Sequence, residues 1–149
     1  MKSKTILLAL VCFSVTTVHA QTPAPATQCK DHAPVTLTAG MKVVSQWKGD
    51  NWWVATIDKI NGDYYEVTFS DGEKGIKKAG EVVAHPDVLY VDGVPPCLKA
   101  GDKVVSAWQK DSWWKATVDK VSGDIIELTY SDGEKGLHKS KEMVPAPVI

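Results

Sequence analysis

Tryptophan is the residue type in this chain whose spacing points to binding chemistry. Each of two segments carries one tryptophan followed by an adjacent pair: Trp47, Trp52 and Trp53, then Trp108, Trp113 and Trp114. An indole can hold a cation over its ring face, and a desolvated contact of this kind contributes about 2 kcal/mol or more. It can equally fill the core of a small domain. The place of each tryptophan in the fold therefore decides which role is open to it.

The tryptophans belong to a block that occurs twice. Residues 40–83 and 101–144 align without a gap at an offset of 61, and 26 of the 44 paired positions are identical. Domains of this size have thin cores and rely on closed barrels, cross-links or mutual packing. We therefore expect two small domains, at residues 40–84 and 101–145, joined by a connector over residues 85–100.

The repeated block alternates apolar and polar residues as β-strands do. Trp53, Ala55 and Ile57 fall on one face, and the second copy supports this assignment because it replaces the intervening Val54 with Lys115. Glycine-containing turns are predicted at residues 61–63, 70–72, 122–124 and 131–133. In the first copy, further strands are predicted at residues 65–69, 75–78 and 82–84, with a helical turn around residues 79–81.

Short strands joined by tight turns predict a small curved sheet that closes on itself. We expect an all-β chain made of two tandem SH3-like barrels of about five strands each. The connector contains His85-Pro86 and Pro95-Pro96. Its 88–91 stretch is predicted to add an edge strand.

Strand alternation separates the tryptophans into two groups. Trp53 and Trp114 share the inward face, where they either plug the barrel end or line a pocket. Trp52 and Trp113 point away from the barrel core. An outward indole in both copies indicates packing between the modules or a contact surface, and packing between the modules is favoured.

The first 20 residues have the pattern of a secretory signal peptide. Lys2 and Lys4 precede an apolar run over residues 6–13 and the small-residue sequence that ends at Ala20. We expect cleavage after Ala20, which makes the protein secreted or periplasmic, with residues 21–39 as a flexible lead-in. No later stretch of the sequence is long and apolar enough to span a membrane.

Two cysteines, Cys29 and Cys97, remain after this cleavage. In an oxidising compartment an even pair is most simply a disulfide, which here would tie together the approaches to the two repeats. Closing a loop of that length stabilises the fold by about 4 kcal/mol in the chain-entropy model. Two buried free thiols are the alternative.

The charge pattern argues against a nucleic-acid partner. The chain has 17 lysines, no arginine and a formal net charge of −1. Arginine is the residue that reads phosphates and guanines bidentately, and no lysine-rich face is visible to replace it.

Catalytic and metal-binding patterns are missing from the sequence as well. His32, His85 and His138 show no ligand spacing with each other or with the cysteines. The sequence contains no nucleophile elbow, HExxH, P-loop or GxGxxG motif. We therefore expect neither an enzyme nor a bound metal or cofactor.

The pattern G-x-K-V-V-S-x-W, then WW-x-A-T and then V-T-F-S-D-G-E, resembles the Tudor and Agenet-type domains of the Tudor-like superfamily. The resemblance covers both repeats, at residues 40–84 and 101–145. It implies five-stranded SH3-like barrels, which often occur in tandem. Several members of that superfamily bind methylated lysine or arginine in an aromatic cage.

The resemblance implies a candidate cage of three aromatic residues and one acid in each repeat. The candidates are Trp47, Trp53, Phe69 and Asp71 in the first repeat and Trp108, Trp114, Tyr130 and Asp132 in the second. The family often has another aromatic residue two positions after the acid, where this chain has Glu73 and Glu134. Three rings with one carboxylate select a methylated ammonium, and an additional Glu shifts the preference toward cations that retain an N–H.

Two functions follow from these patterns. The first is a binding module that recognises a peptide or a small cationic group through aromatic pockets. The second is a structural or interaction protein of the cell envelope whose tryptophans only pack the barrels. Asp71 and Asp132 suit the SDGEKG turns under either hypothesis. The sequence leaves the ligand and the oligomeric state open.

Overall fold

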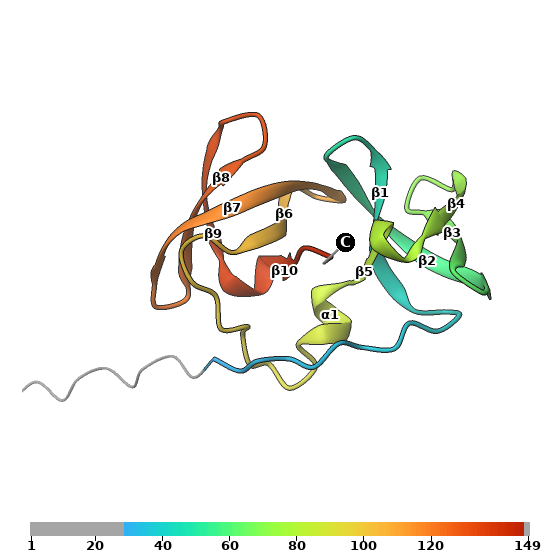
Figure 1. The fold of residues 1–149 in the computed structure, drawn as a ribbon, viewed down its shortest axis with the longest axis horizontal. Coiled ribbons are helices and arrows are strands. Elements are labelled where there is room, and N and C mark those ends of the chain that lie inside the picture. Colours follow the sequence, from blue (N-terminus) through green and yellow to red (C-terminus); the bar gives the residue numbers. More distant parts are fainter. Residues whose placement is uncertain (1–28, 148–149) are drawn as a thin grey trace, which may run out of the picture.

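The computed structural model describes residues 29–147, which are mostly antiparallel β-structure (Figure 1). The all-β class predicted from the alternation is confirmed. The predicted signal peptide and its cleavage position lie outside the described residues. Within residues 29–147, no helix combines the length and the apolar character needed to cross a membrane.

The first repeat forms five strands, which we call the first module. They are β1 (Lys42–Lys48), β2 (Asn51–Asn61), β3 (Tyr64–Phe69), β4 (Lys74–Lys78) and β5 (Val82–Ala84), with a 3₁₀ turn η1 (Ala79–Glu81) before β5. The second repeat forms the second module in the same order. Its elements are β6 (Lys103–Gln109), β7 (Ser112–Ser122), β8 (Ile125–Tyr130), β9 (Lys135–Lys139), η2 (Ser140–Glu142) and β10 (Met143–Pro145). The predicted helical turn over residues 79–81 is confirmed.

Each module has its own apolar interior, built from the strand faces that the alternation predicts. The first core contains Val43, Ala55, Ile57, Val67, Phe69 and Val82. The second contains Val104, Ala116, Val118, Ile126, Leu128, Tyr130 and Met143. Full burial of a side chain such as Val or Leu stabilises a fold by roughly 1.5–3 kcal/mol. Because each core has only six or seven buried residues, each of them contributes a substantial part of the stability of its module.

The long strands β2 and β7 pair with each other and join the two modules into one ten-stranded sheet. Six strands follow the order β10-β6-β7-β2-β1-β5, while β3 and β4 branch from β2, and β8 and β9 branch from β7. The pairing is antiparallel and short. It sets Trp52 opposite Trp113, with Asn51 opposite Trp114 and Trp53 opposite Ser112. Figure 1 shows the two modules side by side, with β7 reaching across toward the first module.

The connector does not contain the predicted edge strand. Residues 86–89 form the short helix α1 (Pro86–Leu89), so the prediction of a strand at 88–91 is wrong. The reason is local. Pro86 has a backbone suited to the first helical position, and the His85 ring accepts a hydrogen bond from the Asp87 backbone N–H, at 3.2 Å, as a helix cap.

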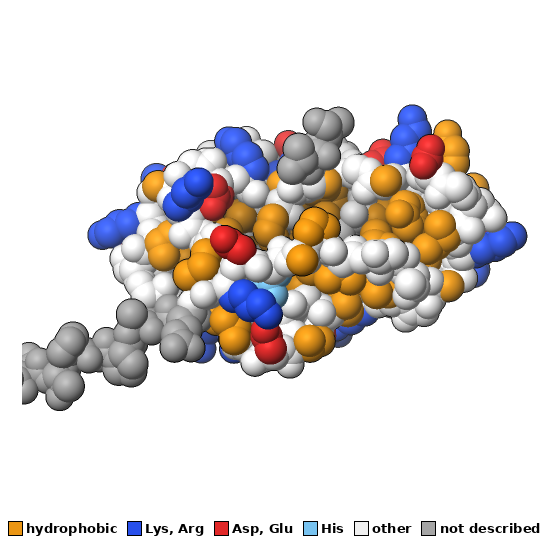
Figure 2. Space-filling view, turned by 60° about the horizontal axis from the view of Figure 1, so that its bottom comes forward, with side chains coloured by type: hydrophobic (Ala, Val, Ile, Leu, Met, Phe, Trp, Pro, Cys, Tyr) orange, Lys and Arg blue, Asp and Glu red, His pale blue; other side chains and the backbone are white. Residues whose placement is uncertain are grey.

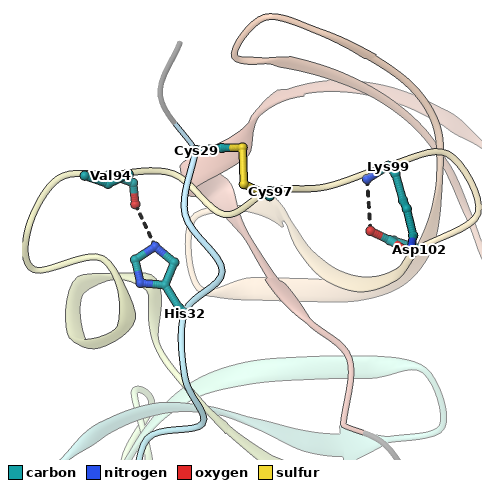
Figure 3. The surroundings of a disulfide bond; sticks show 6 residues. All are labelled: Cys29, His32, Val94, Cys97, Lys99 and Asp102. Carbon is teal, nitrogen blue, oxygen red and sulfur yellow. Dashed lines mark hydrogen bonds between the residues drawn. A yellow bond between two sulfur atoms is a disulfide. The ribbon is translucent and has the colours of Figure 1, made fainter.

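A disulfide links Cys29 to Cys97, as the even cysteine count predicted (Figure 3). Around it, the Lys30 N–H donates to the Pro95 carbonyl at 3.0 Å, and the Cys97 N–H donates to the Lys30 carbonyl at 3.3 Å. A His32 ring nitrogen lies 2.9 Å from the Val94 carbonyl. The described part of the lead-in is therefore fastened to the connector by covalent and polar contacts.

Candidate aromatic pockets

In each repeat, the lone tryptophan lies beside the second tryptophan of the adjacent pair, and the two indole planes are steeply inclined to each other. The ring centroids of Trp47 and Trp53 are 6.1 Å apart, with a 57° angle between the planes. Those of Trp108 and Trp114 are 6.4 Å apart, at 73°. A register shift in β1 and in β6 lies at each lone tryptophan, and such irregularities re-aim a side chain relative to its strand.

The third predicted ring of each cage is buried. Phe69 and Tyr130 are each 4% exposed and belong to the module cores. Trp47 and Trp53 pack against the core that contains Phe69, and Trp114 packs against the core that contains Tyr130. Phe69 and Tyr130 therefore support the tryptophans, and the solvent-facing aromatic surface comes from the tryptophan pairs.

Tyr130 differs from Phe69 by a hydroxyl that joins a polar network. This hydroxyl lies 3.0 Å from the Ala107 carbonyl, to which it donates, and 2.7 Å from His138 Nε2. The other ring nitrogen of His138 lies 3.4 Å from a carboxylate oxygen of Glu142. Burial is the largest cause that raises the pKa of the Tyr130 phenol. The hydroxyl therefore stays protonated near neutral pH and fixes the ring.

The acids Asp71 and Asp132 organise the turns. Each carboxylate accepts a hydrogen bond from the backbone N–H two residues later, at 2.9 Å, on Glu73 and Glu134 respectively. The acid that touches the first tryptophan pair is Glu73, because the Trp47 indole N–H donates to its carboxylate at 3.3 Å. The sequence placed Glu73 where the family often has an aromatic residue, but it did not predict this contact.

Two lysines of the first module lie over two of its aromatic rings. Lys48 Nζ lies 4.7 Å from the Trp47 ring centroid, and Lys77 Nζ lies 5.7 Å from the Phe69 ring centroid. Both distances are within the range of a cation–π contact. Part of the aromatic surface of the first module therefore already has a cation from the chain itself.

Trp52 and Trp113 lie in the seam between the modules. They are 0% and 4% exposed, in one cluster with Val44, Val105 and Val144. The prediction that they pack between the modules is confirmed, so neither indole can meet a ligand. Within residues 29–147, four buried indole N–H groups have no hydrogen-bond partner: those of Trp52, Trp53, Trp113 and Trp114.

A separate groove of about 770 Å³ lies where the lead-in, the connector and the end of the second module meet. Apolar side chains such as Leu37, Leu89 and Leu98 line much of it. Figure 2 shows hydrophobic side chains gathered on a face of the molecule. This groove contains none of the predicted cage residues.

The histidines do not form a metal site. Within residues 29–147, no group of three or more His, Cys, Asp or Glu residues is arranged to hold a metal ion. His85 is buried against Trp113, with ring centroids 5.4 Å apart. Burial is the main cause that lowers the pKa of the His85 imidazole, and the charge of Lys42 lowers it further. This ring is therefore a neutral structural group near pH 7.

No family model and no curated protein matches this chain. Solved structures similar to it include that of Arabidopsis thaliana AGDP1 AGD34, with 16% identity and a TM-score of 0.44, covering 72% of this chain and 81% of the other. The ADCP1 tandem Agenet domain 3-4 has 17% identity and a TM-score of 0.42, covering 72% and 79%. The Crb2 tandem tudor domains have 17% identity and a TM-score of 0.32, covering 76% and 83%. Likenesses at this level transfer neither a ligand nor a partner to this chain.

Proposed function

We propose that this chain is a secreted or periplasmic binding module, which recognises a cationic group on a peptide or small molecule at its tryptophan pairs. The observation that carries this proposal is the indole of Trp108, which is 43% exposed and 6.4 Å from the Trp114 ring. The exposed Trp108 indole offers a cation a π face, which contributes roughly 0.5–2 kcal/mol depending on desolvation, and the Trp114 ring lies beside it at a steep angle.

The electrostatics of the adjoining turns support a cationic ligand. The turn after β8 carries Asp132 and Glu134, and the equivalent turn of the first module brings Glu73 to the Trp47 indole. Carboxylates beside aromatic faces favour ammonium groups over anions. Methylated ammonium is a suitable ligand class because it is large, cationic and poor in hydrogen-bond donors, and we include it in the proposal.

The N-terminal sequence and the disulfide support the proposed cellular compartment. Residues 1–20 have the pattern of an export signal, and the Cys29–Cys97 bond is of the kind that persists in oxidising surroundings. We therefore propose a ligand that is present outside the cytoplasm, on an envelope peptide or as a free small cation. Nucleic acid is not a proposed partner.

Tryptophan fluorescence tests the proposal. The chain from residue 21 onward is titrated with trimethyl-lysine, asymmetric dimethyl-arginine and choline, with uncharged norleucine as the control. A saturable change with the cations, and none with norleucine, supports the proposal. A folded protein that responds to none of the three cations contradicts it.

A structural role is the rival function, and one observation favours it. Trp53 and Trp114 pack against the module cores, with indole N–H groups that have no partner in the described residues. Under this rival, Trp53→Ala lowers the free energy of unfolding by about 3–5 kcal/mol, and no cation binds to the unsubstituted chain. Denaturant unfolding and the fluorescence titration together separate the two functions.

A further inference from the structure

The two modules differ at two positions where the first module has a lysine over an aromatic ring. Lys48 in the first module corresponds to Gln109 in the second at the offset of 61, and Lys77 corresponds to His138. The first module therefore has an ammonium at each position, where the second has a neutral amide and an imidazole. The strands that carry these residues occupy equivalent places in the two modules.

In the first module these lysines lie over the aromatic rings. Lys48 Nζ is 4.7 Å from the Trp47 ring centroid, and Lys77 Nζ is 5.7 Å from that of Phe69. A ligand cation would have to compete with Lys48 for the Trp47 ring face. It would also meet the positive charge of Lys77, which lies over the buried ring of the core against which Trp47 and Trp53 pack. In the first module, Lys48 and Lys77 thus provide positive charge at the rings where a cationic ligand would otherwise bind.

In the second module the rings have no such cover. Within residues 29–147, the structure places no lysine over Trp108, Trp114 or Tyr130, and this includes Lys110 in the turn after β6. His138 is held in the network with Tyr130 and Glu142, at 2.7 and 3.4 Å. Both ring nitrogens of His138 therefore already have a polar neighbour.

The acidic residues of the two turns also differ in their contacts. Glu73 accepts a hydrogen bond from the Trp47 indole at 3.3 Å. The structure gives no equivalent bond between Trp108 and Glu134 within the described residues, and Trp108 is 43% exposed whereas Trp47 is partly buried. The second module thus presents an accessible indole and a carboxylate that is not engaged with it.

We propose that the second module is the one that binds the cationic ligand, through Trp108, Trp114 and Glu134, and that Lys48 and Lys77 close the first module. This inference rests on the proposed function and assigns it to one of the two tryptophan pairs. The ligand class is a monovalent alkylammonium that fits beside two indoles. The residues at positions 48 and 77, and their counterparts at 109 and 138, determine which of the two modules binds the cation.

Isothermal titration with tetramethylammonium and with trimethyl-lysine tests this assignment. The unsubstituted chain binds one equivalent, and Trp108→Ala weakens that binding by about 10-fold or more. The double variant Lys48→Gln, Lys77→His gives the first module the residues of the second, and it binds two equivalents. When Trp108→Ala is added to the double variant, one equivalent remains. Ile76→Ala, at a side chain that is 71% exposed, is the matched surface control and keeps one equivalent.

The outcomes separate this inference from the proposed function. If the unsubstituted chain binds two equal equivalents, or if Trp108→Ala leaves its binding unchanged, the assignment to the second module is wrong while the proposed function stands. If the double variant still binds one equivalent, the closing role of Lys48 and Lys77 is wrong. If neither the unsubstituted chain nor the double variant binds either cation, both are wrong. Circular dichroism of each variant establishes that it is folded before the titrations are compared.

Discussion

Trp52 and Trp113 lie directly opposite each other in the β2–β7 pair, and they are the same position of the two repeats. The flanking pairs, Asn51 with Trp114 and Trp53 with Ser112, are also equivalent to each other. Two backbone bonds repeat this symmetry: the Val54 N–H donates to the Asp111 carbonyl at 3.1 Å, and the Lys115 N–H donates to the Asp50 carbonyl at 3.2 Å. The seam therefore has a two-fold arrangement within one chain.

Removal of one seam indole is expected to destabilise both modules. Trp113→Ala leaves a large cavity in the cluster that contains Trp52, so we predict a loss of about 3–5 kcal/mol in the free energy of unfolding. Urea unfolding followed by circular dichroism measures it. Trp108→Ala is the matched control, because its side chain is 43% exposed, and it should cost less than about 1 kcal/mol. Equal losses in the two variants would contradict the burial of Trp113.

The disulfide is expected to stabilise the fold mainly through the long loop that it closes. The two cysteines are 68 residues apart in the sequence. In the chain-entropy model, Cys29→Ser with Cys97→Ser lowers the free energy of unfolding by about 4 kcal/mol. Urea unfolding with and without a reducing agent measures the effect. The agent should lower the midpoint of the unsubstituted chain and leave that of the double variant unchanged, and a shift in the double variant would point to another cause.

Acidification is expected to destabilise the connector through His85. Burial lowers the pKa of this imidazole in the folded state below the ordinary value of 6.5, so the fold favours the neutral ring. Its contribution to stability is complete above about pH 6.5 and is lost as the pH falls from 6.5 through the folded-state pKa. His85→Asn retains an acceptor for the helix cap but does not titrate. Between about pH 7.5 and pH 5.5, the urea midpoint of the unsubstituted chain should therefore fall further than that of His85→Asn. Equal falls would show that His85 carries none of the pH dependence.

Gly133, in the turn before β9, is expected to be required because of its positive φ and not because of a lack of space for a side chain. Gly133 has a φ of 93°, and a Cβ atom there would meet no other atom within 4 Å. Gly133→Ala should therefore cost about 1–2 kcal/mol from backbone strain without any clash. Gly80→Ala is the matched control, since Gly80 also has open space around it but does not have a positive φ. Thermal unfolding of the two variants checks the difference, and a lower melting temperature for Gly80→Ala than for Gly133→Ala would contradict it.

Strand alternation predicted which tryptophans face the module interior. Successive side chains of a strand point to opposite faces, so this prediction needs only the residues of the strand itself. Alternation placed Trp52 and Trp113 outside the barrels and favoured packing between the modules. It could not predict that β2 and β7 would pair, since that depends on two strands 61 residues apart. The 88–91 prediction failed because its apolar pattern also suits a short helix, and the cap at His85 with Pro86 decided the outcome.

The candidate pockets were predicted less completely than the fold. Residue type and resemblance identified the tryptophan pairs. They did not predict that Lys48 and Lys77 lie over rings of the first module. Strand alternation gives the face on which a residue lies, but it does not give the conformation of a long side chain. The contact between Glu73 and Trp47 was missed for the same reason.

A two-fold seam within a single polypeptide lets the two halves of an otherwise symmetric molecule carry different residues. In a dimer of identical chains, a lysine that covered one pocket would cover its twin as well. Here residue 48 is Lys and its counterpart at 109 is Gln, although Trp52 and Trp113 keep the seam itself symmetric. Covalent linkage of the repeats thus permits one half to keep a residue that covers an aromatic ring while the equivalent ring of the other half stays open to solvent.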